Sequence, residues 1–381
     1  MNRYNIAILG ATGIVGLELL KILDERRFPV SELRLFASAG SVGKYIKFKS
    51  SRFKVQEINN KSFKDIDIAF FAVDGSISKK WAPIAVKSGA VVIDKSSAFR
   101  MNKDVPLVIP EINAQAIEKK MIDERKKMKD NNQKLSSLTS HLSSFPMIIA
   151  SPNCSTTPLA MVLKPLNDYA KVKRVVVSTY QSVSGAGLQA VQEMEEQTKQ
   201  LLLRTPQGVY PAKGGALRTW YAFNAIPQID SFCEGDYTGE EIKMIQETRK
   251  ILNDYSIKIT ATCVRIPVYC GHSESVNIET VRPVTVAQVR NLLSRVKGIK
   301  VIDVPKKGLY PMPIDVAGKD EVFVGRIRLD QTLRNGINPV RDRSPKATVN
   351  SNGVNLWLVS DNLRKGAALN AVQIAEYLIS G

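Results

Sequence analysis

The first residues of the chain place a strand, a glycine-rich turn and a helix in immediate succession. Residues 5–9 form a short apolar run, GATGIVG follows at 10–16, and LELLKIL (17–23) has the spacing of an amphipathic helix. Glycines three apart at such a junction permit a tight turn, close approach of the backbone to a pyrophosphate and close helix packing. The helix N-terminus adds amide donors and a positive end. The segment therefore predicts a dinucleotide site, although a plain strand-to-helix turn would leave the same pattern.

Alternation of apolar strands and helical segments continues from this start. Further strands are expected at 33–38, 66–73, 90–94 and 107–110, with helical segments between some of them. This order predicts an α/β fold: a doubly wound parallel sheet of Rossmann type, with ligands beyond the carboxyl ends of its strands. A length of 381 residues leaves room for at least one more domain.

The second half of the chain predicts an α+β domain. Helical patterns occur at about 158–170 and 188–204. Long, half-exposed strands are expected at 256–268, 273–281, 321–329 and 355–361, as in a mixed sheet covered on one face by helices.

Two polar stretches interrupt the pattern, at 118–145 and 333–352. The second half of the first stretch is expected to be an exposed insertion. The final helix, about 368–379, is expected to pack on the first domain. We therefore expect one domain at 1–153 and 360–381, which holds the predicted dinucleotide site, and a second domain at 154–359.

Charge and cysteine content limit the partners and the compartment. The net charge is +18, but Lys and Arg are scattered and no nucleic-acid motif occurs, so a solvated basic surface is the preferred interpretation and no nucleic acid is expected. No apolar run is long enough to span a membrane, and the start MNRYN does not resemble a secretory signal, so we expect a cytoplasmic protein. The four cysteines lack a CxxC pair, which favours free thiols over disulfides or a metal site.

Cys154 is the candidate nucleophile. It lies in SPNCSTTP (151–158), after an apolar strand and before residues typical of a first helical turn, so its thiol would face the positive end of a helix. A buried, inert thiol is the alternative, and it is the more common fate of a cysteine. A nucleophilic thiol needs a base, and the chain has two histidines. His141 lies in the first polar stretch, so His272, beside a Gly turn, is the credible partner.

The segment after the second strand indicates which cofactor is bound. A site for NAD usually places a carboxylate there to bind the ribose, whereas this chain has SAGSVGK (38–44). Small hydroxyls with Lys44 nearby accept a 2′-phosphate better than a carboxylate would. The sequence thus favours NADP over NAD.

Nine ordered motifs carry a resemblance to aspartate-semialdehyde dehydrogenase over nearly the whole chain. They are GATGIVG, KSSAFR, VIPEIN, SPNCSTTPL, QSVSGAG, FNAIPQID, YTGEEIKMIQETRKIL, ATCVRIPVYCGHSES and VSDNLRKGAALNAVQIAEYL. The resemblance implies a second domain like that of glyceraldehyde-3-phosphate dehydrogenase, and homodimers that pair into tetramers in some members. It also implies NADPH-dependent reductive dephosphorylation of L-aspartyl-4-phosphate, on the route to diaminopimelate, lysine, threonine and methionine.

The resemblance also assigns roles. Cys154 would form a thioester and His272 would act as general acid and base, while Gln181 would orient the substrate. Arg265 would bind the α-carboxylate and Glu240 the α-amino group; Arg100 and Lys243, supported by Asn153, would bind phosphate. Cofactor contacts would fall on Gly10, Thr12, Gly13, Ile14, Val15, Ser38, Gly40, Ser41, Ser184, Gly185 and Asn362.

Two positions depart from the family pattern. Many members carry an Arg where Gly40 stands, so the preference for NADP rests here on Ser38, Ser41 and Lys44. Asp74 replaces a usual Gly near the cofactor, and its charge would repel phosphates if it pointed inward.

Plain structural roles would account for some of these residues. Glu240 and Lys243, three apart on an expected helix, would also form an ordinary surface ion pair. Arg265 and His272 are seven apart, too far along an extended chain to share a small substrate, so the chain must turn near 270–271.

Two other functions stay open at this point. N-acetyl-γ-glutamyl-phosphate reductase shares the glycine loop and a cysteine mechanism. A non-enzymatic, basic binding protein on the same fold would keep the motifs without turnover.

Overall fold

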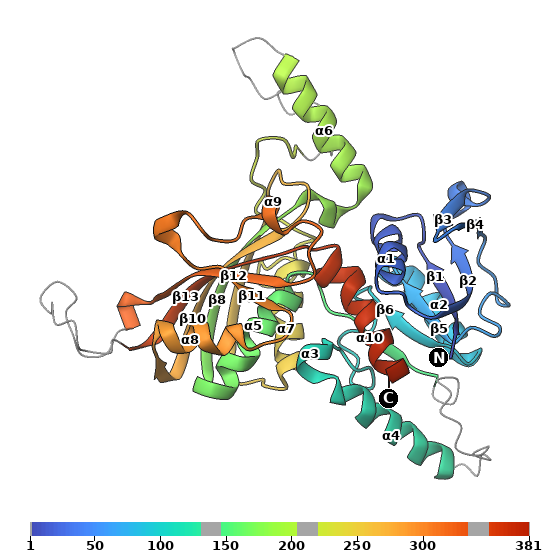
Figure 1. Cartoon of the computed structure of the whole chain (residues 1–381), viewed down its shortest axis with the longest axis horizontal. Coiled ribbons are helices and arrows are strands. Elements are labelled where there is room, and N and C mark those ends of the chain that lie inside the picture. Colours follow the sequence, from blue (N-terminus) through green and yellow to red (C-terminus); the bar gives the residue numbers. More distant parts are fainter. Residues whose placement is uncertain (1, 131–145, 204–219, 334–349, 381) are drawn as a thin grey trace, which may run out of the picture. The chain divides into compact units, whose positions relative to one another are not determined.

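The computed structural model describes residues 2–130, 146–203, 220–333 and 350–380 (Figure 1). His141, the second half of the 118–145 stretch and nearly all of the 333–352 stretch lie outside the described residues. The chain divides into two compact units, each described by itself. Unit 1 comprises Met1–Ala160, Gln246–Asp254 and Leu363–Gly381, and unit 2 comprises Met161–Ile245 and Tyr255–Asn362.

Unit 1 contains a seven-stranded sheet with the order β3-β4-β2-β1-β5-β6-β7. Its strands are β1 (Tyr4–Leu9), β2 (Val30–Phe36), β3 (Tyr45–Phe48), β4 (Ser51–Gln56), β5 (Ile68–Phe71), β6 (Val91–Asp94) and β7 (Ile148–Ala150). All neighbours pair in parallel except β3 and β4, which form an antiparallel hairpin. The expected α/β fold with a Rossmann-type sheet is confirmed.

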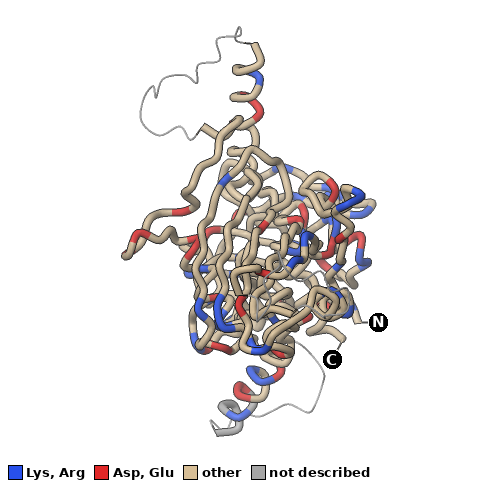
Figure 2. Tube along the Cα trace, turned by 90° about the vertical axis from the view of Figure 1, so that its left-hand side faces the viewer, with Lys and Arg blue, Asp and Glu red and all other residues tan. Residues whose placement is uncertain are grey.

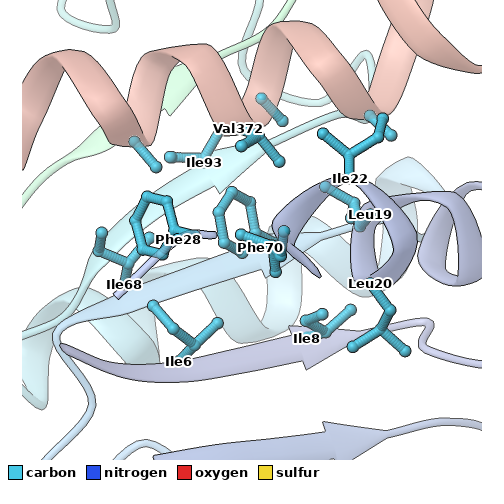
Figure 3. Packing of buried hydrophobic residues seen from close by; sticks show 14 of the residues in the cluster. Ile6, Ile8, Leu19, Leu20, Ile22, Phe28, Ile68, Phe70, Ile93 and Val372 are labelled. Carbon is cyan, nitrogen blue, oxygen red and sulfur yellow. The ribbon is translucent and has the colours of Figure 1, made fainter. Parts of the chain in front are cut away.

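Helices cover both faces of this sheet because successive side chains of a strand point to opposite sides. On one face Ile8 packs in a cluster with Leu19 of α1 (Ile14–Glu25) and Val372 of α10 (Leu369–Ser380) (Figure 3). On the other face Ala7 packs with Ala82 of α2 (Gly75–Lys87). The final helix therefore belongs to the core of unit 1, as the sequence predicted.

Three local predictions were incomplete or wrong. The strand expected at 107–110 is only a single bridge from Leu107 to Ala150, because Pro110 begins the short helix α3 (Pro110–Asn113). The β3–β4 hairpin was not predicted. The start of the 118–145 stretch is helical, within α4 (Gln115–Asp130), on which basic and acidic residues are mixed (Figure 2).

Unit 2 contains a mixed six-stranded sheet with the order β11-β12-β13-β10-β8-β9. Its strands are β8 (Val172–Gln181), β9 (Lys258–Arg265), β10 (His272–Val284), β11 (Ile299–Val301), β12 (Val322–Leu329) and β13 (Ser351–Ser360). The helices α6 (Leu188–Leu203), α8 (Val286–Ser294) and α9 (Pro313–Val316) belong to unit 2, while α5 (Thr156–Ala170) and α7 (Gly239–Leu252) have residues in both units. The predicted mixed sheet is confirmed.

Burial alternates along the central strands of unit 2, which fixes where polar groups face. On β8, Val175, Val177, Thr179 and Gln181 are buried, and the residues between them are half-buried. The buried face thus ends in polar side chains at the carboxyl end of β8. Within the described ranges, no helix has both the length and the apolar character needed to cross a membrane.

Candidate active site

The glycine turn after β1 is shaped by close backbone contacts. Gly10 has a φ of +86°, and a Cβ there would lie 2.2 Å from the carbonyl oxygen of Ala72. A Cβ on Gly16 would lie 2.2 Å from the carbonyl oxygen of Gly10, so glycine lets α1 pack against the turn. Gly13 is the N-cap of α1, with no side-chain cap and no acidic residue in the first turn. The N-terminus of α1 thus keeps its amide donors for an anion.

The segment after β2 has no carboxylate. Ser38, Gly40 and Ser41 lie in and around a short 3₁₀ turn (Ala39–Ser41), and a Cβ on Gly40 would meet nothing within 4 Å. Asp74 is the exposed N-cap of α2. A 2′-phosphate therefore has hydroxyl donors and open space beside this turn, which fits NADP.

Cys154 lies between β7 and α5, and its side chain is half-buried. The Asn153 side chain caps the helix: its Oδ1 accepts hydrogen bonds from the amides of Ser155 (2.9 Å) and Thr156 (3.2 Å). The thiol is therefore held at the positive end of α5, where the thiolate is favoured. Cys263, by contrast, is fully buried, and this burial raises the pKa of its thiol.

Arg100 lies at the carboxyl side of β6, in the same unit as Cys154. Its Nη1 donates to Oε1 of Glu247 at 2.9 Å, and Glu247 also accepts the amide of Asn153 at 2.8 Å. The Nε of Arg100 is buried and has no acceptor among the described residues. The Nε–H group is therefore a donor that could bind an oxyanion.

His272 opens β10, and its ring is 1% exposed. Its Nδ1 accepts the amide N–H of Ser182 at 3.1 Å, so the neutral ring carries its proton on Nε2. Burial, and next the guanidinium of Arg265, hold the pKa of His272 well below its usual value. The imidazole is therefore neutral near pH 7, with its proton on Nε2.

The side chains of Arg265 and His272 both lie beside Gly185. Gly271 has a φ of +94° and turns the chain between β9 and β10, as the seven-residue separation required. A Cβ on Gly185 would lie 2.9 Å from Nη1 of Arg265 and 3.2 Å from Cε1 of His272. These two side chains, seven residues apart in one motif, therefore flank the same backbone position.

A buried chain of polar contacts joins three other predicted residues. The Gln181 amide donates to Glu240 at 3.2 Å, and Lys243 lies 3.3 Å from Glu240 and 2.7 Å from Asp230. Glu240 is 4% exposed, so this is not an ordinary surface ion pair. Gln181 is also the cross-strand partner of Arg265.

Asn362, at the end of unit 2, links the remaining predicted residues. Its Nδ2 donates to Ser184 Oγ at 2.9 Å, and its Oδ1 accepts from the amide of Gly271 at 2.9 Å and from Ser182 Oγ at 3.0 Å. The structure thus places Ser184, Gly185 and Asn362 next to His272.

The predicted residues form two groups. Unit 1 carries Cys154, Asn153, Arg100 and the glycine turn; unit 2 carries His272, Gln181, Glu240, Lys243 and Arg265 with the Ser184 loop. Sequence reasoning missed Glu247, Lys95 and Ser182. Glu247 follows Lys243 by four residues on α7, and Lys95 begins the KSSAFR motif, so both signals were present but had no partner to define a role.

Family models match two regions of the chain. Residues 5–120 match a family model described as the NAD binding domain of semialdehyde dehydrogenase, and residues 163–341 match its dimerisation domain. The fold and the site together define a semialdehyde dehydrogenase.

Individual relatives specify the family. The chain is 47% identical to the aspartate-semialdehyde dehydrogenase of Aquifex aeolicus, covering 99% of this chain and 98% of that one, and 44% identical to the enzyme of Bacillus subtilis, covering 98% and 97%. A crystal structure of aspartate semialdehyde dehydrogenase II from Vibrio cholerae, complexed with ASA, superposes with a TM-score of 0.82 at 41% identity and covers 100% of this chain and 99% of that one. The chain belongs to the aspartate-semialdehyde dehydrogenase family, and it is an NADP-dependent oxidoreductase.

Proposed function

We propose that the chain reduces L-aspartyl-4-phosphate to L-aspartate 4-semialdehyde and phosphate, and that Cys154 and His272 carry the chemistry. The observation that carries the proposal is the half-buried thiol at the N-terminus of α5, capped by Asn153. An acyl phosphate is an electrophile that such a thiolate attacks readily.

The reaction is proposed to pass through a thioester on Cys154. The thiolate attacks the acyl carbon, the C–O bond to phosphate breaks, and phosphate leaves with its electron pair. When bound, NADPH supplies the hydride that the acyl carbon requires. Cleavage of the C–S bond then releases the aldehyde and regenerates the thiolate.

His272 is proposed to transfer one proton in each direction. Its Nε2 gives a proton to the acyl oxygen as charge develops there, and takes it back when the carbonyl re-forms and the C–S bond breaks. The lowered pKa of His272 supports this assignment, because it keeps the ring neutral at the start and at the end of each cycle.

Substrate binding is proposed to use the charged groups around these two residues. Arg265 would bind the α-carboxylate, Glu240 the α-amino group, and Gln181 would orient the acyl group. Arg100, through its unpartnered Nε, and Lys243 would bind phosphate together with Asn153.

For the cofactor, we propose contacts in both units. The turn around Gly10, Thr12, Gly13, Ile14 and Val15 would bind the pyrophosphate, and Ser38, Gly40 and Ser41 the 2′-phosphate. Ser184, Gly185 and Asn362 would bind the nicotinamide end. The uncapped N-terminus of α1 and the absence of a carboxylate in the described turn after β2 support this choice.

We further propose the domain limits 1–153 with 360–381 for the cofactor and 154–359 for catalysis and dimerisation. The compact units and the two matched family regions support limits near these. A homodimer is expected from the dimerisation domain, and pairing of dimers into a tetramer is the finer proposal. The cytoplasm is the proposed compartment.

The deciding experiment is phosphate-dependent reduction of NADP by aspartate semialdehyde. We expect turnover in the wild-type enzyme and a loss of about 10³-fold or more in Cys154→Ser, because a hydroxyl at this position is a far weaker nucleophile than a thiolate. Cys233→Ser, an exposed cysteine, is the matched control and should retain turnover.

Other outcomes identify the alternatives. Activity confined to N-acetylglutamate semialdehyde would establish the glutamyl-phosphate reductase instead. Absence of turnover in both wild type and Cys154→Ala, together with salt-sensitive binding of nucleic acid, would establish a non-enzymatic protein.

A further inference from the structure

The peptide bond between Pro152 and Asn153, just before Cys154, is held at both of its polar atoms by charged side chains, those of the half-buried Lys95 and the buried Glu247. The carbonyl oxygen of Pro152 accepts a hydrogen bond from Nζ of Lys95 at 3.0 Å. The amide of Asn153 donates to Oε2 of Glu247 at 2.8 Å. A cation thus faces the negative end of this peptide dipole, and an anion faces its positive end.

Lys95 makes two further contacts from its position just after β6. Its Nζ donates to Oγ of Ser151 at 3.1 Å and to the carbonyl oxygen of Gly366 at 3.1 Å. With the oxygen of Pro152, these three acceptors match the three donors of an ammonium group. Lys95 therefore ties the segment before Cys154 to the chain at Gly366.

Gly366 lies directly against the nucleophile. It belongs to the π-helical turn Arg364–Ala368, and a Cβ at this position would lie 2.9 Å from the Cβ of Cys154. Turns of this kind are frequent at functional sites. The backbone that Lys95 holds through Gly366 is therefore also the backbone that limits where Cys154 can lie.

Glu247 holds the segment from the other side. Its side chain is 1% exposed, and its second oxygen accepts from Arg100 at 2.9 Å. One carboxylate therefore joins the Asn153 amide to the guanidinium proposed to bind phosphate.

Electrostatics links these groups to the thiol. Burial lowers the pKa of Lys95 to about 7, and Arg100 also lowers it, whereas the Cys154 thiolate and Glu247 oppose the shift. Attraction between two charges is mutual, so the ammonium favours the thiolate.

We propose that Lys95 and Glu247 are positioning residues: together they clamp the Pro152–Asn153 peptide and so set the position and the charge state of Cys154. The inference rests on the proposed role of Cys154 as nucleophile. The two residues touch no substrate atom and act through the backbone and the local field.

The test measures the thiol directly. Alkylation of Cys154 by iodoacetamide is followed against pH by mass spectrometry of the peptide that contains it, because the thiolate is the reactive form. We expect Lys95→Met to raise the midpoint of the alkylation profile by about one pH unit. Lys95→Arg, which keeps a cation, should restore most of this shift.

Glu247→Gln should move the midpoint the other way, because it removes a negative charge that disfavours the thiolate. Shifts of the alkylation midpoint in opposite directions would distinguish the clamp from general damage to the fold. General damage would shift the midpoint in a direction that does not depend on the sign of the charge removed. If Lys95→Met does not fold, Glu247→Gln decides: a midpoint unchanged or raised overturns the proposal. A wild-type midpoint in folded Lys95→Met also overturns it.

Lys365→Met is the matched control. Lys365 is a fully buried lysine of unit 1, and its ammonium group is held by Glu111, Asn370 and Gln373. This variant should leave the midpoint of Cys154 unchanged. Because alkylation needs no substrate turnover, failure of the clamp and failure of the proposed reaction give different results.

Discussion

Glu274 is a fully buried acidic residue of unit 2. It lies on β10, two residues after His272, and neither carboxylate oxygen has a hydrogen-bond partner among the described residues. Burial raises the pKa of Glu274 well above its usual value. Between the ordinary pKa of a glutamate and this raised value, the folded protein holds a carboxylic acid while the unfolded chain holds a carboxylate.

Proton linkage gives this residue a measurable effect on stability. Between the ordinary pKa of a glutamate and the raised value, the folded state binds more protons than the unfolded state. The free energy of unfolding must then fall as pH rises through that window. This is opposite in sign to the usual effect of a salt-bridged carboxylate.

We expect Glu274→Gln to remove this dependence. Relative to wild type, the variant should gain up to about 1.4 kcal/mol in the free energy of unfolding for each pH unit within the window. Urea unfolding at about pH 5.5 and pH 7.5 measures the gain, with the exposed Glu234→Gln as control. A difference that is equal at the two pH values would mean that Glu274 ionises in the folded state.

Residue type and spacing selected Cys154, His272 and the glycine turn, whereas the other candidate site residues came from the resemblance to the family. Cys154 and His272 were recognisable because each stands at a turn where its chemistry has few rivals in the chain. Lys95 and Glu247 were not recognisable, because the role of a lysine or a glutamate depends on the residues that it contacts in the folded chain. Arg100 and Glu247 are 147 positions apart, and no local pattern predicts that they pair.

Among the secondary-structure elements, α1 shows how packing can depend on the absence of a side chain at one position. Gly16 lies on α1 against the carbonyl oxygen of Gly10, and an added Cβ would approach this oxygen to 2.2 Å. The nearest atoms are backbone atoms of Gly10 and Ala11, so no flexible side chain is present that could move away.

We expect Gly16→Ala to lower the free energy of unfolding by about 1–3 kcal/mol, because the helix must shift away from the turn. Gly13→Ala is the matched control: its Cβ would approach the nearest atom, the same oxygen, only to 3.4 Å. Unfolding is measured without added nucleotide so that cofactor binding does not contribute. Equal stability of the two variants would show that α1 tolerates the displacement.

Strands with strong apolar runs were predicted within a few residues, whereas the β3–β4 hairpin was not. Its sequence, YIKFKSSRFKVQ, is polar at alternate positions and lies at the edge of the sheet. The 107–110 run has the apolar character of a strand, but Pro110 starts a helix there. Edge elements depend on a neighbour to supply their hydrogen bonds, and that neighbour is not visible in the local sequence.

For the assembled protein, the outer face of the unit 2 sheet is the surface to test. On it Ser275 of β10 pairs with Ser178 of β8 and with Trp357 of β13, and the rings of Tyr180 and Trp357 lie 5.4 Å apart. All of these residues are half-buried. A half-buried sheet face that carries aromatic side chains, in a region matched as a dimerisation domain, is suited to a second copy of the chain.

We expect light scattering to give the wild type at least twice the chain mass of 42.1 kDa. Ser275→Arg places a long charged side chain in the middle of this face and should shift the mass to that of one chain. Ser31→Arg, on an exposed position of unit 1, should not change the mass. A dimer that persists in Ser275→Arg would place the interface elsewhere; a tetramer in the wild type would establish pairing of dimers.

The sequence by itself predicted most strands and helices, the glycine turn and the candidate reactive side chains Cys154 and His272, because spacing and residue type along the chain are local properties. Only the tertiary structure decided which charges meet. His272 is neutral because it is buried beside Arg265. Its Nδ1 accepts a hydrogen bond from the amide of Ser182, which is 90 positions away. The Pro152–Asn153 peptide is held because Lys95 and Glu247 converge on it. Burial and charge pairing act through space, and distance in space is set only when the chain has folded.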